Sequence, residues 1–100
     1  MDYLIAKSGD SAIVKLSGRL LYSDNKKFLA LLEEMLSLLC ADNVFDLDEL
    51  DFIDSTGLGM LVIANDTALK RGSRIRLCRA RGRVRDVIEI VEFATIMTVE

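Results

Sequence analysis

Apolar residues along the chain recur with two different periods, and each period predicts one kind of element. Residues 3–7 and 11–17 are short apolar-rich runs separated by Ser8-Gly9-Asp10, and the second run has an apolar residue at every even position. A period of two places such residues on one face of a strand. The sequence therefore predicts a hairpin or two neighbouring strands, with the second strand ending at Gly18.

Three later segments change to the period of an amphipathic helix, with apolar residues three and four positions apart. In residues 24–39 these are Phe28, Leu31, Leu32, Met35, Leu36 and Leu39. A second helix should begin near Ser55 and end at Gly72, and its inward face should be Leu58, Leu61, Val62, Asn65, Ala68 and Leu69. A third helix is marked by Val84, Val87, Ile88 and Val91. Ser23 or Asp24 is suited to cap the first of these helices.

The remaining apolar runs predict strands at residues 43–47, 74–78 and 96–99, with a loop through Glu49 and Asp51 after the first of them. The resulting order is β-β-α-β-α-β-α-β. It indicates an α/β fold in which a mostly parallel central β-sheet packs against helices. A length of 100 residues suits one domain, spanning residues 1–100. We expect its core to include Leu31, Leu32, Met35, Val44, Leu61, Val62 and Val87.

The residue types that the chain lacks exclude several kinds of enzyme. It has no histidine, which rules out catalytic triads and metal sites that are built on that residue. Cys40 and Cys78 are too few for a zinc cluster, and we expect them to be buried thiols. No glycine-rich loop is present for a nucleotide phosphate. We therefore expect no enzymatic activity, no metal and no cofactor.

Hydropathy and charge indicate a cytoplasmic protein. The longest apolar stretch, from Phe28 to Cys40, is interrupted by Glu33 and Glu34, whereas a membrane span needs roughly 18–20 apolar residues. The N-terminal residues lack the basic-then-apolar order of a signal peptide. The formal net charge of −3 is modest. We expect a monomer with no membrane partner.

Basic residues are concentrated in one segment. Eight of the 13 lie between Lys70 and Arg85, and arginine occupies every second position from residue 79 to residue 85. On a helix this spacing sends side chains to different faces, and the segment has no aromatic residue that could stack on a base. We expect a solvated surface that faces an acidic partner, and no binding of nucleic acid.

The stretch from Leu47 to Gly59 carries the most information about function. It begins as a strand and ends as the first turn of a helix, where Asp54, Ser55 and Thr56 can all act as caps. Free amide groups and the positive end of the helix dipole lie at such a turn. A phosphate on a hydroxyl there would gain from both, while a neighbouring aspartate would repel its charge. From these residues alone helix capping is the simpler explanation, and a phosphorylation site, with Ser55 as candidate and Thr56 as its competitor, is the alternative.

The same stretch resembles the signature of the STAS family, the fold of bacterial anti-sigma factor antagonists. That signature is an apolar strand ending in D-L, a few further residues, and then an apolar pair followed by D-S-[ST]-G-L-G. Here it reads Val44-Phe45-Asp46-Leu47, then Leu50, then Phe52-Ile53-Asp54-Ser55-Thr56-Gly57-Leu58-Gly59. Gly18-Arg19-Leu20 also resembles the G-x-L that ends the second strand of the family.

The resemblance implies a partner-binding protein without enzymatic activity. The partner is an anti-sigma factor that is also a serine kinase; it phosphorylates the residue that matches Ser55, and a phosphatase resets the switch. The residues implied to bind the partner are Asp54, Ser55, Thr56, Gly57, Leu58, Gly59 and Asp24. One difference concerns the residue after G-x-L, which is acidic in many antagonists but Leu21 here, with Asp24 three positions later.

Three alternatives to a phosphorylated antagonist would use the chain differently. A STAS subunit of an ABC transporter would keep the fold but would bind and steady an ATPase without being phosphorylated. A receiver domain would use Asp54 as phospho-acceptor, but the first strand ends in Lys7-Ser8-Gly9-Asp10 and offers no acidic pair for magnesium. A carboxylate enzyme has no support beyond the 16 acidic residues, which a solvated surface explains.

Overall fold

The computed structural model describes residues 1–100 and contains five strands, three α-helices and two short 3₁₀ turns. The strands are β1 (Asp2–Ser8), β2 (Ser11–Leu20), β3 (Asp42–Ile53), β4 (Arg74–Cys78) and β5 (Thr98–Val99). The helices are α1 (Asn25–Leu36), α2 (Ser55–Lys70) and α3 (Gly82–Ile90), and the 3₁₀ turns are Tyr22–Asp24 and Phe93–Thr95. The predicted order of elements and the α/β class are thus confirmed.

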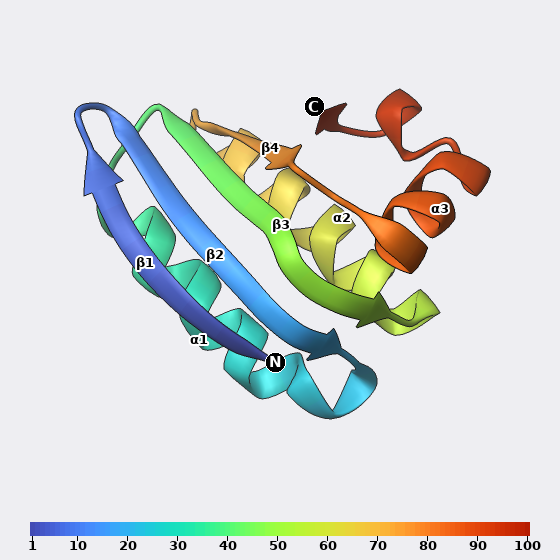
Figure 1. The fold of residues 1–100 in the computed structure, drawn as a ribbon. Coiled ribbons are helices and arrows are strands. Elements are labelled where there is room, and N and C mark those ends of the chain that lie inside the picture. The colour runs from blue at the N-terminus through green and yellow to red at the C-terminus, as the bar shows by residue number, and fades with distance from the viewer.

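The five strands form one sheet in the order in which they follow along the chain, β1-β2-β3-β4-β5. β1 runs antiparallel to β2, and all the other neighbours are parallel. Helices α1 and α2 cover one face of the sheet, behind it in Figure 1, while no helix covers the front of β1, β2 and β3. Helix α3 lies beside the second half of β3, where β4 has already ended (Figure 1).

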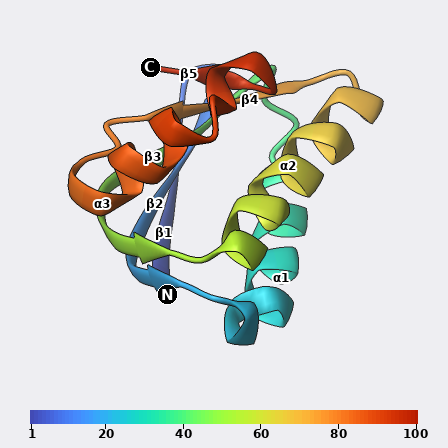
Figure 2. The same cartoon turned by 90° about the vertical axis from the view of Figure 1, so that its right-hand side faces the viewer.

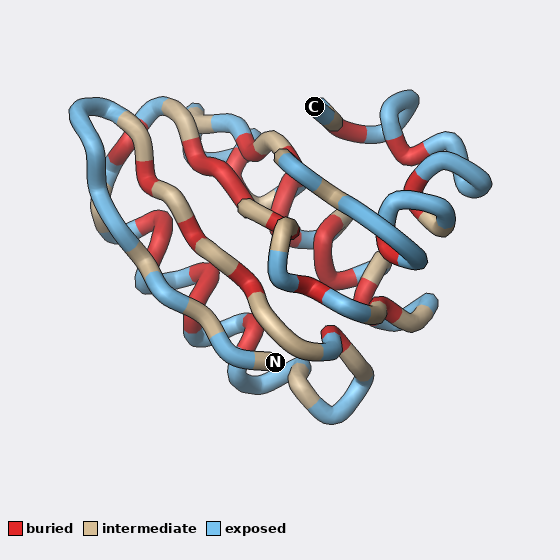
Figure 3. Tube along the Cα trace, in the orientation of Figure 1, coloured by how far each residue is buried: buried red, intermediate tan, exposed pale blue.

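The core lies between the sheet and the helices. Buried and half-buried positions alternate along β2, as Figure 3 shows, so that one face of the strand points into the core. Phe28 of α1 and Phe45 of β3 stack there with ring centroids 5.7 Å apart. The core residues predicted on α1, together with Leu61 of α2, are confirmed as buried.

Val44 is also buried, as predicted; because it alternates with Phe45, it lies on the opposite face of β3 from the main core cluster. Other predictions of buried residues need correction. Val62 and Val87 are only partly buried at the margin of the core. Leu39 and Leu69 are exposed, because each lies where its helix has ended or is about to end and the apolar period no longer faces the sheet.

The two longest strands differ from the prediction. β2 does not end at Gly18 but continues through it to Leu20, with Gly18 at a φ of +81° that favours glycine. The segment predicted as a loop after residue 47 is part of β3, which pairs with β2 as far as Ile53. Shifts in the register between these strands show that β3 carries extra, bulged residues. Because each bulge inserts one extra residue, the apolar residues of β3 do not follow the two-residue period by which a strand is recognised in a sequence.

The ends of several elements are confirmed and others are shorter than predicted. Gly72 follows α2 with a φ of +77°, as expected for a helix-ending glycine. The final strand contains only two residues, because Ile96 and Met97 still belong to the preceding turn, where their amides donate to the carbonyl of Phe93. Cys40 is a buried thiol, whereas Cys78 is only half-buried, and neither forms a disulfide. Spanning a bilayer requires a length and a hydropathy that no helix of this chain combines.

Candidate functional site

Asp54 organises the junction between β3 and α2. It is the N-cap of α2, with extended backbone angles, and its Oδ1 accepts a hydrogen bond of 2.7 Å from the amide of Gly57. Its Oδ2 accepts a second bond of 3.1 Å from the amide of Tyr22, and its own amide donates to the carbonyl of Leu20. Asp54 thus caps the helix with its side chain, and its backbone and side chain together link the end of β3 to Leu20 and to the turn that follows β2.

Ser55 and Thr56 are the first two residues of α2, and both are exposed. Of the three residues predicted as caps, only Asp54 accepts a capping bond, and neither hydroxyl has a hydrogen-bond partner in the structure. Because Asp54 already caps the helix, neither hydroxyl is needed for capping, and both are available to react or to bind a partner. They project from the positive end of a helix of 16 residues.

The two glycines of this turn have different surroundings. A Cβ on Gly57 would lie 2.7 Å from the carbonyl oxygen of Leu20 and 2.7 Å from Cγ1 of Ile53. The close approach at Gly57 is therefore made by the chain's own β2 and β3. Gly59 is exposed, and a Cβ there would meet nothing within 4 Å.

Asp24 lies close to the turn but does not present its carboxylate to solvent. Its Oδ2 accepts a 2.8 Å bond from the amide of Leu21, and its Oδ1 forms a 3.2 Å ion pair with the N-terminal ammonium of Met1. It occupies the N-cap position of α1 without capping that helix, contrary to the prediction. Burial disfavours its charge, but the Leu21 amide and the ammonium outweigh burial and lower the pKa of Asp24.

The structure therefore brings most of the predicted site residues together at the carboxyl ends of β2 and β3. Ser55, Thr56 and Gly59 are exposed there, Asp54 and Leu58 are half-buried, and Gly57 is buried. Two features that the sequence did not single out lie at the same junction. Tyr22 is 72% exposed, and the guanidinium of Arg19 stacks over the ring of Phe52. Finding them needed the pairing of β2 with β3, which no local motif encodes.

The arginine-rich segment lies mainly beside β3 instead of along a helix. Arg79 and Arg81 precede α3, so the helical spacing argument does not apply to them. Arg79 forms a 2.6 Å ion pair with Asp46, and Arg81 pairs with Asp51 at 3.4 Å. The Arg79 guanidinium holds the pKa of Asp46 below its ordinary value. The acidic partner of these arginines is therefore the chain's own β3.

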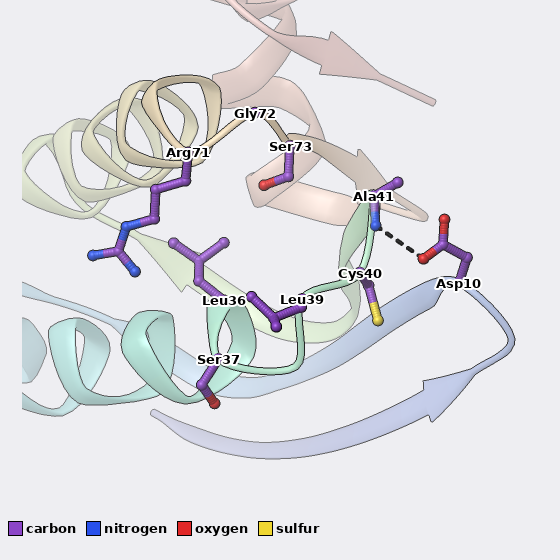
Figure 4. A pocket seen from close by; sticks show the side chains of 9 residues that line it. All are labelled: Asp10, Leu36, Ser37, Leu39, Cys40, Ala41, Arg71, Gly72 and Ser73. Atoms are coloured by element: carbon purple, nitrogen blue, oxygen red, sulfur yellow. Dashed lines mark hydrogen bonds between the residues drawn. The ribbon is translucent and has the colours of Figure 1, made fainter.

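A pocket of 490 Å³ lies at the opposite end of the sheet, where β3 and β4 begin and where α1 and α2 end. Figure 4 shows its lining: Asp10, Leu36, Ser37, Leu39, Cys40, Ala41, Arg71, Gly72 and Ser73. None of the predicted site residues lines it. The structure has no cluster of three or more side chains that could hold a metal ion.

Comparison with known proteins places this arrangement in a family. The model described as the STAS domain matches residues 3–100, and a search of curated proteins gave no match. An anti-sigma factor antagonist from Mycobacterium paratuberculosis superposes with a TM-score of 0.84 at 18% identity, over 98% of this chain and 83% of that one.

Two further solved structures share the fold. The Bacillus cell fate determinant SpoIIAA in its phosphorylated form has a TM-score of 0.71 at 15% identity, over 99% of this chain and 91% of that one. A sulfate transporter family protein from Wolinella succinogenes has a TM-score of 0.74 at 16% identity, over 90% and 73% of the two chains. The predicted family is confirmed by the family model, and the fold by these structures: the chain belongs to the STAS domain family.

Proposed function

We propose that the chain is an anti-sigma factor antagonist that is switched by phosphorylation of Ser55. In this proposal it binds an anti-sigma factor that is also a serine kinase, a phosphatase reverses the modification, and the chain itself has no enzymatic activity. It acts in the cytoplasm as a monomer. The observation that carries the proposal is the free, exposed hydroxyl of Ser55 beside the capping carboxylate of Asp54.

The local electrostatics support a switch at this position. A phosphate on Ser55 would carry a charge of about −1.5 to −2 and would lie near the unpaired amides at the start of α2. The carboxylate of Asp54 is fixed by two amides and cannot turn away from the new charge. The phosphate therefore projects outward and changes the surface that a partner meets, without disturbing the core.

The likeness to a sulfate transporter family protein supports one alternative, a STAS domain that binds a transporter component and is not phosphorylated. In that case the turn at Asp54 would serve as a permanent contact surface. The unmodified hydroxyls of Ser55 and Thr56 would then be part of the interface and not a point of control.

A phosphorylation assay tests the proposal. The purified chain is incubated with ATP and with each serine-kinase anti-sigma factor of the source organism in turn. Mass spectrometry should place the phosphate on Ser55, and Ser55→Ala should abolish it while Thr56→Ala retains it. Ser55→Ala should also bind the kinase constitutively, and Ser55→Asp should bind it more weakly. Phosphate on Thr56 would move the switch by one residue. Absence of phosphate on both, with binding unchanged in both Ser55 variants, would favour the transporter alternative.

A further inference from the structure

We propose that the docking surface extends from the Asp54 turn onto Tyr22 and the Arg19–Phe52 pair, and that it fits a protein face presenting a carboxylate beside an apolar pocket. The inference rests on the proposed function for the class of partner. It adds Arg19 and Tyr22 as contact residues and gives the charge of the partner group that Arg19 meets.

The side chain of Arg19 is oriented by its neighbours before any anion binds. Arg19 of β2 pairs with Phe52 of β3, and Leu20 and Ile53 beside them point into the core, so this pair faces the side of the sheet without helices. The Arg19 guanidinium lies 5.1 Å from the centre of the Phe52 ring, which restricts its side chain before any partner arrives.

The charge of Arg19 is also uncompensated. Six of the eight arginines form ion pairs with carboxylates, namely Arg71, Arg74, Arg76, Arg79, Arg81 and Arg85. Arg19 forms none, although the chain is acidic overall. A planar guanidinium suits a carboxylate, which it can bind through two parallel hydrogen bonds. A stacked arginine without a counter-ion therefore favours an acidic group on the partner.

Tyr22 supplies an aromatic anchor on the other side of the turn. Its side chain is 72% exposed, yet its backbone is fixed in a 3₁₀ turn and its amide is bonded to Asp54. An exposed aromatic ring on a fixed backbone loses little conformational freedom on binding, and Tyr and Arg are enriched among residues that dominate interface energies. The partner should therefore offer an apolar pocket for this ring.

The three features lie on backbone segments that are bonded to one another at the Asp54 turn. The carbonyl of Leu20, which lies between Arg19 and Tyr22 in sequence, accepts the amide of Asp54. Arg19, Tyr22 and Ser55 thus project from neighbouring backbone segments that hydrogen bonds hold together. A phosphate on Ser55 would place negative charge beside the carboxylate expected on the partner, which gives the switch a physical reason for weakening the complex.

Titration calorimetry of variants tests whether this surface binds the partner. Each variant is titrated with purified anti-sigma factor kinases of the source organism. Arg19→Glu should weaken binding about 10-fold or more, because it sets two carboxylates against each other, and Tyr22→Ala should weaken it by a similar factor. Lys70→Glu makes the same charge change at the far end of α2, and Leu39→Ala removes an exposed apolar side chain at the opposite end of the sheet. Both controls should bind as the wild type does, and circular dichroism should show all four variants folded.

The outcomes separate the two proposals. If the wild type binds and Ser55→Asp does not, but Arg19→Glu and Tyr22→Ala bind normally, the extended surface is wrong and the proposed function stands. If Arg19→Glu changes the binding of the phosphorylated chain only, Arg19 pairs with the Ser55 phosphate and not with the partner, which also overturns the inference. If no kinase binds the wild type, the proposed function fails and the inference fails with it.

Discussion

Two glycines of the same turn should respond in opposite ways to an added methyl group. Gly57→Ala should destabilise the fold by about 1–3 kcal/mol, because its Cβ would meet backbone and core atoms at 2.7 Å. Gly59→Ala should stabilise it by about 0.5–1 kcal/mol, because that position is helical and open. Urea denaturation of the two variants measures both effects. Equal stability of the two proteins would show that Gly57 is not closely packed.

Capping should depend on Asp54 and not on Ser55. Asp54→Ala removes the acceptor of the Gly57 and Tyr22 amides and should cost about 1–2 kcal/mol of unfolding free energy. Ser55→Ala should change that free energy by less than about 0.5 kcal/mol, because the Ser55 hydroxyl has no partner to lose. Thermal and urea melts provide the comparison. A large loss for Ser55→Ala would mean that the serine shares the capping role.

The sequence predicted where the turn lies, but it could not show which of its residues caps the helix. Asp54, Ser55 and Thr56 are all good capping residues, and only the backbone angles at Asp54 select one of them. The placement of Asp24 also needed the fold, because its ion pair joins residues 23 positions apart in the chain. No sequence motif marked Tyr22 or Arg19 as contact residues. Their proposed role depends on the exposure of Tyr22 and on the stacking of Arg19 against a residue of the neighbouring strand.

Among the elements, β3 should lose its ionic contacts to β4 in acid. The hydrogen bond from Arg76 is the main cause of the lowered pKa of Asp42, with Ser11 and Arg74 contributing and burial opposing. A carboxylate with a lowered pKa stabilises the fold above its unfolded pKa of about 3.9, and this contribution is lost as the pH falls through the folded value. Stability should therefore fall as the pH drops below about 4.

Asp42→Asn isolates this contribution. At pH 7 it should be less stable than the wild type by about 1–2 kcal/mol, because it loses a charged partner of Arg76 at 3.0 Å. In strong acid the difference should shrink, because the wild-type carboxyl is then also neutral. Urea midpoints measured across the acid range test this, and a difference that does not change with pH would rule out an ionic origin.

Helix α2 provides a matched pair of leucines. Leu61→Ala should cost about 2–5 kcal/mol, because Leu61 is fully buried. Leu69→Ala should cost less than about 1 kcal/mol, because that side chain is 58% exposed near the end of the helix. Denaturant melts of both variants compare the two positions directly. Similar losses would show that the helix is rotated relative to the sheet.

Element types could be predicted from the apolar periods, but the extent of β3 could not. Leu47, Leu50 and Ile53 are all buried at intervals of three, whereas a regular strand buries every second residue. Each interval contains one bulged residue. Asp48 and Asp51 fall in these intervals and pair with Arg81, so the strand is rich in acidic residues that normally suggest a loop.

On the scale of the whole molecule, internal pairing of the arginines predicts weak binding of nucleic acid. Most of the arginine-rich segment faces the carboxylates of β3 or of its own helix, and the net charge is −3. Binding to the phosphates of a nucleic acid needs arginine or lysine side chains that are not already paired with carboxylates. Titration with labelled single-stranded and double-stranded DNA and RNA at physiological salt should show only weak binding. A sequence-selective complex of submicromolar affinity would contradict this prediction.

The order of strands in the sheet bears on how the chain can fold as it leaves the ribosome. Each new strand pairs with the strand made just before it, so no strand has to wait for a later one before it can pair. The hydrogen-bond partners of Asp54 all come from residues 20–58. The Asp54 turn therefore has all its hydrogen-bond partners while β4 and α3 are still being synthesised.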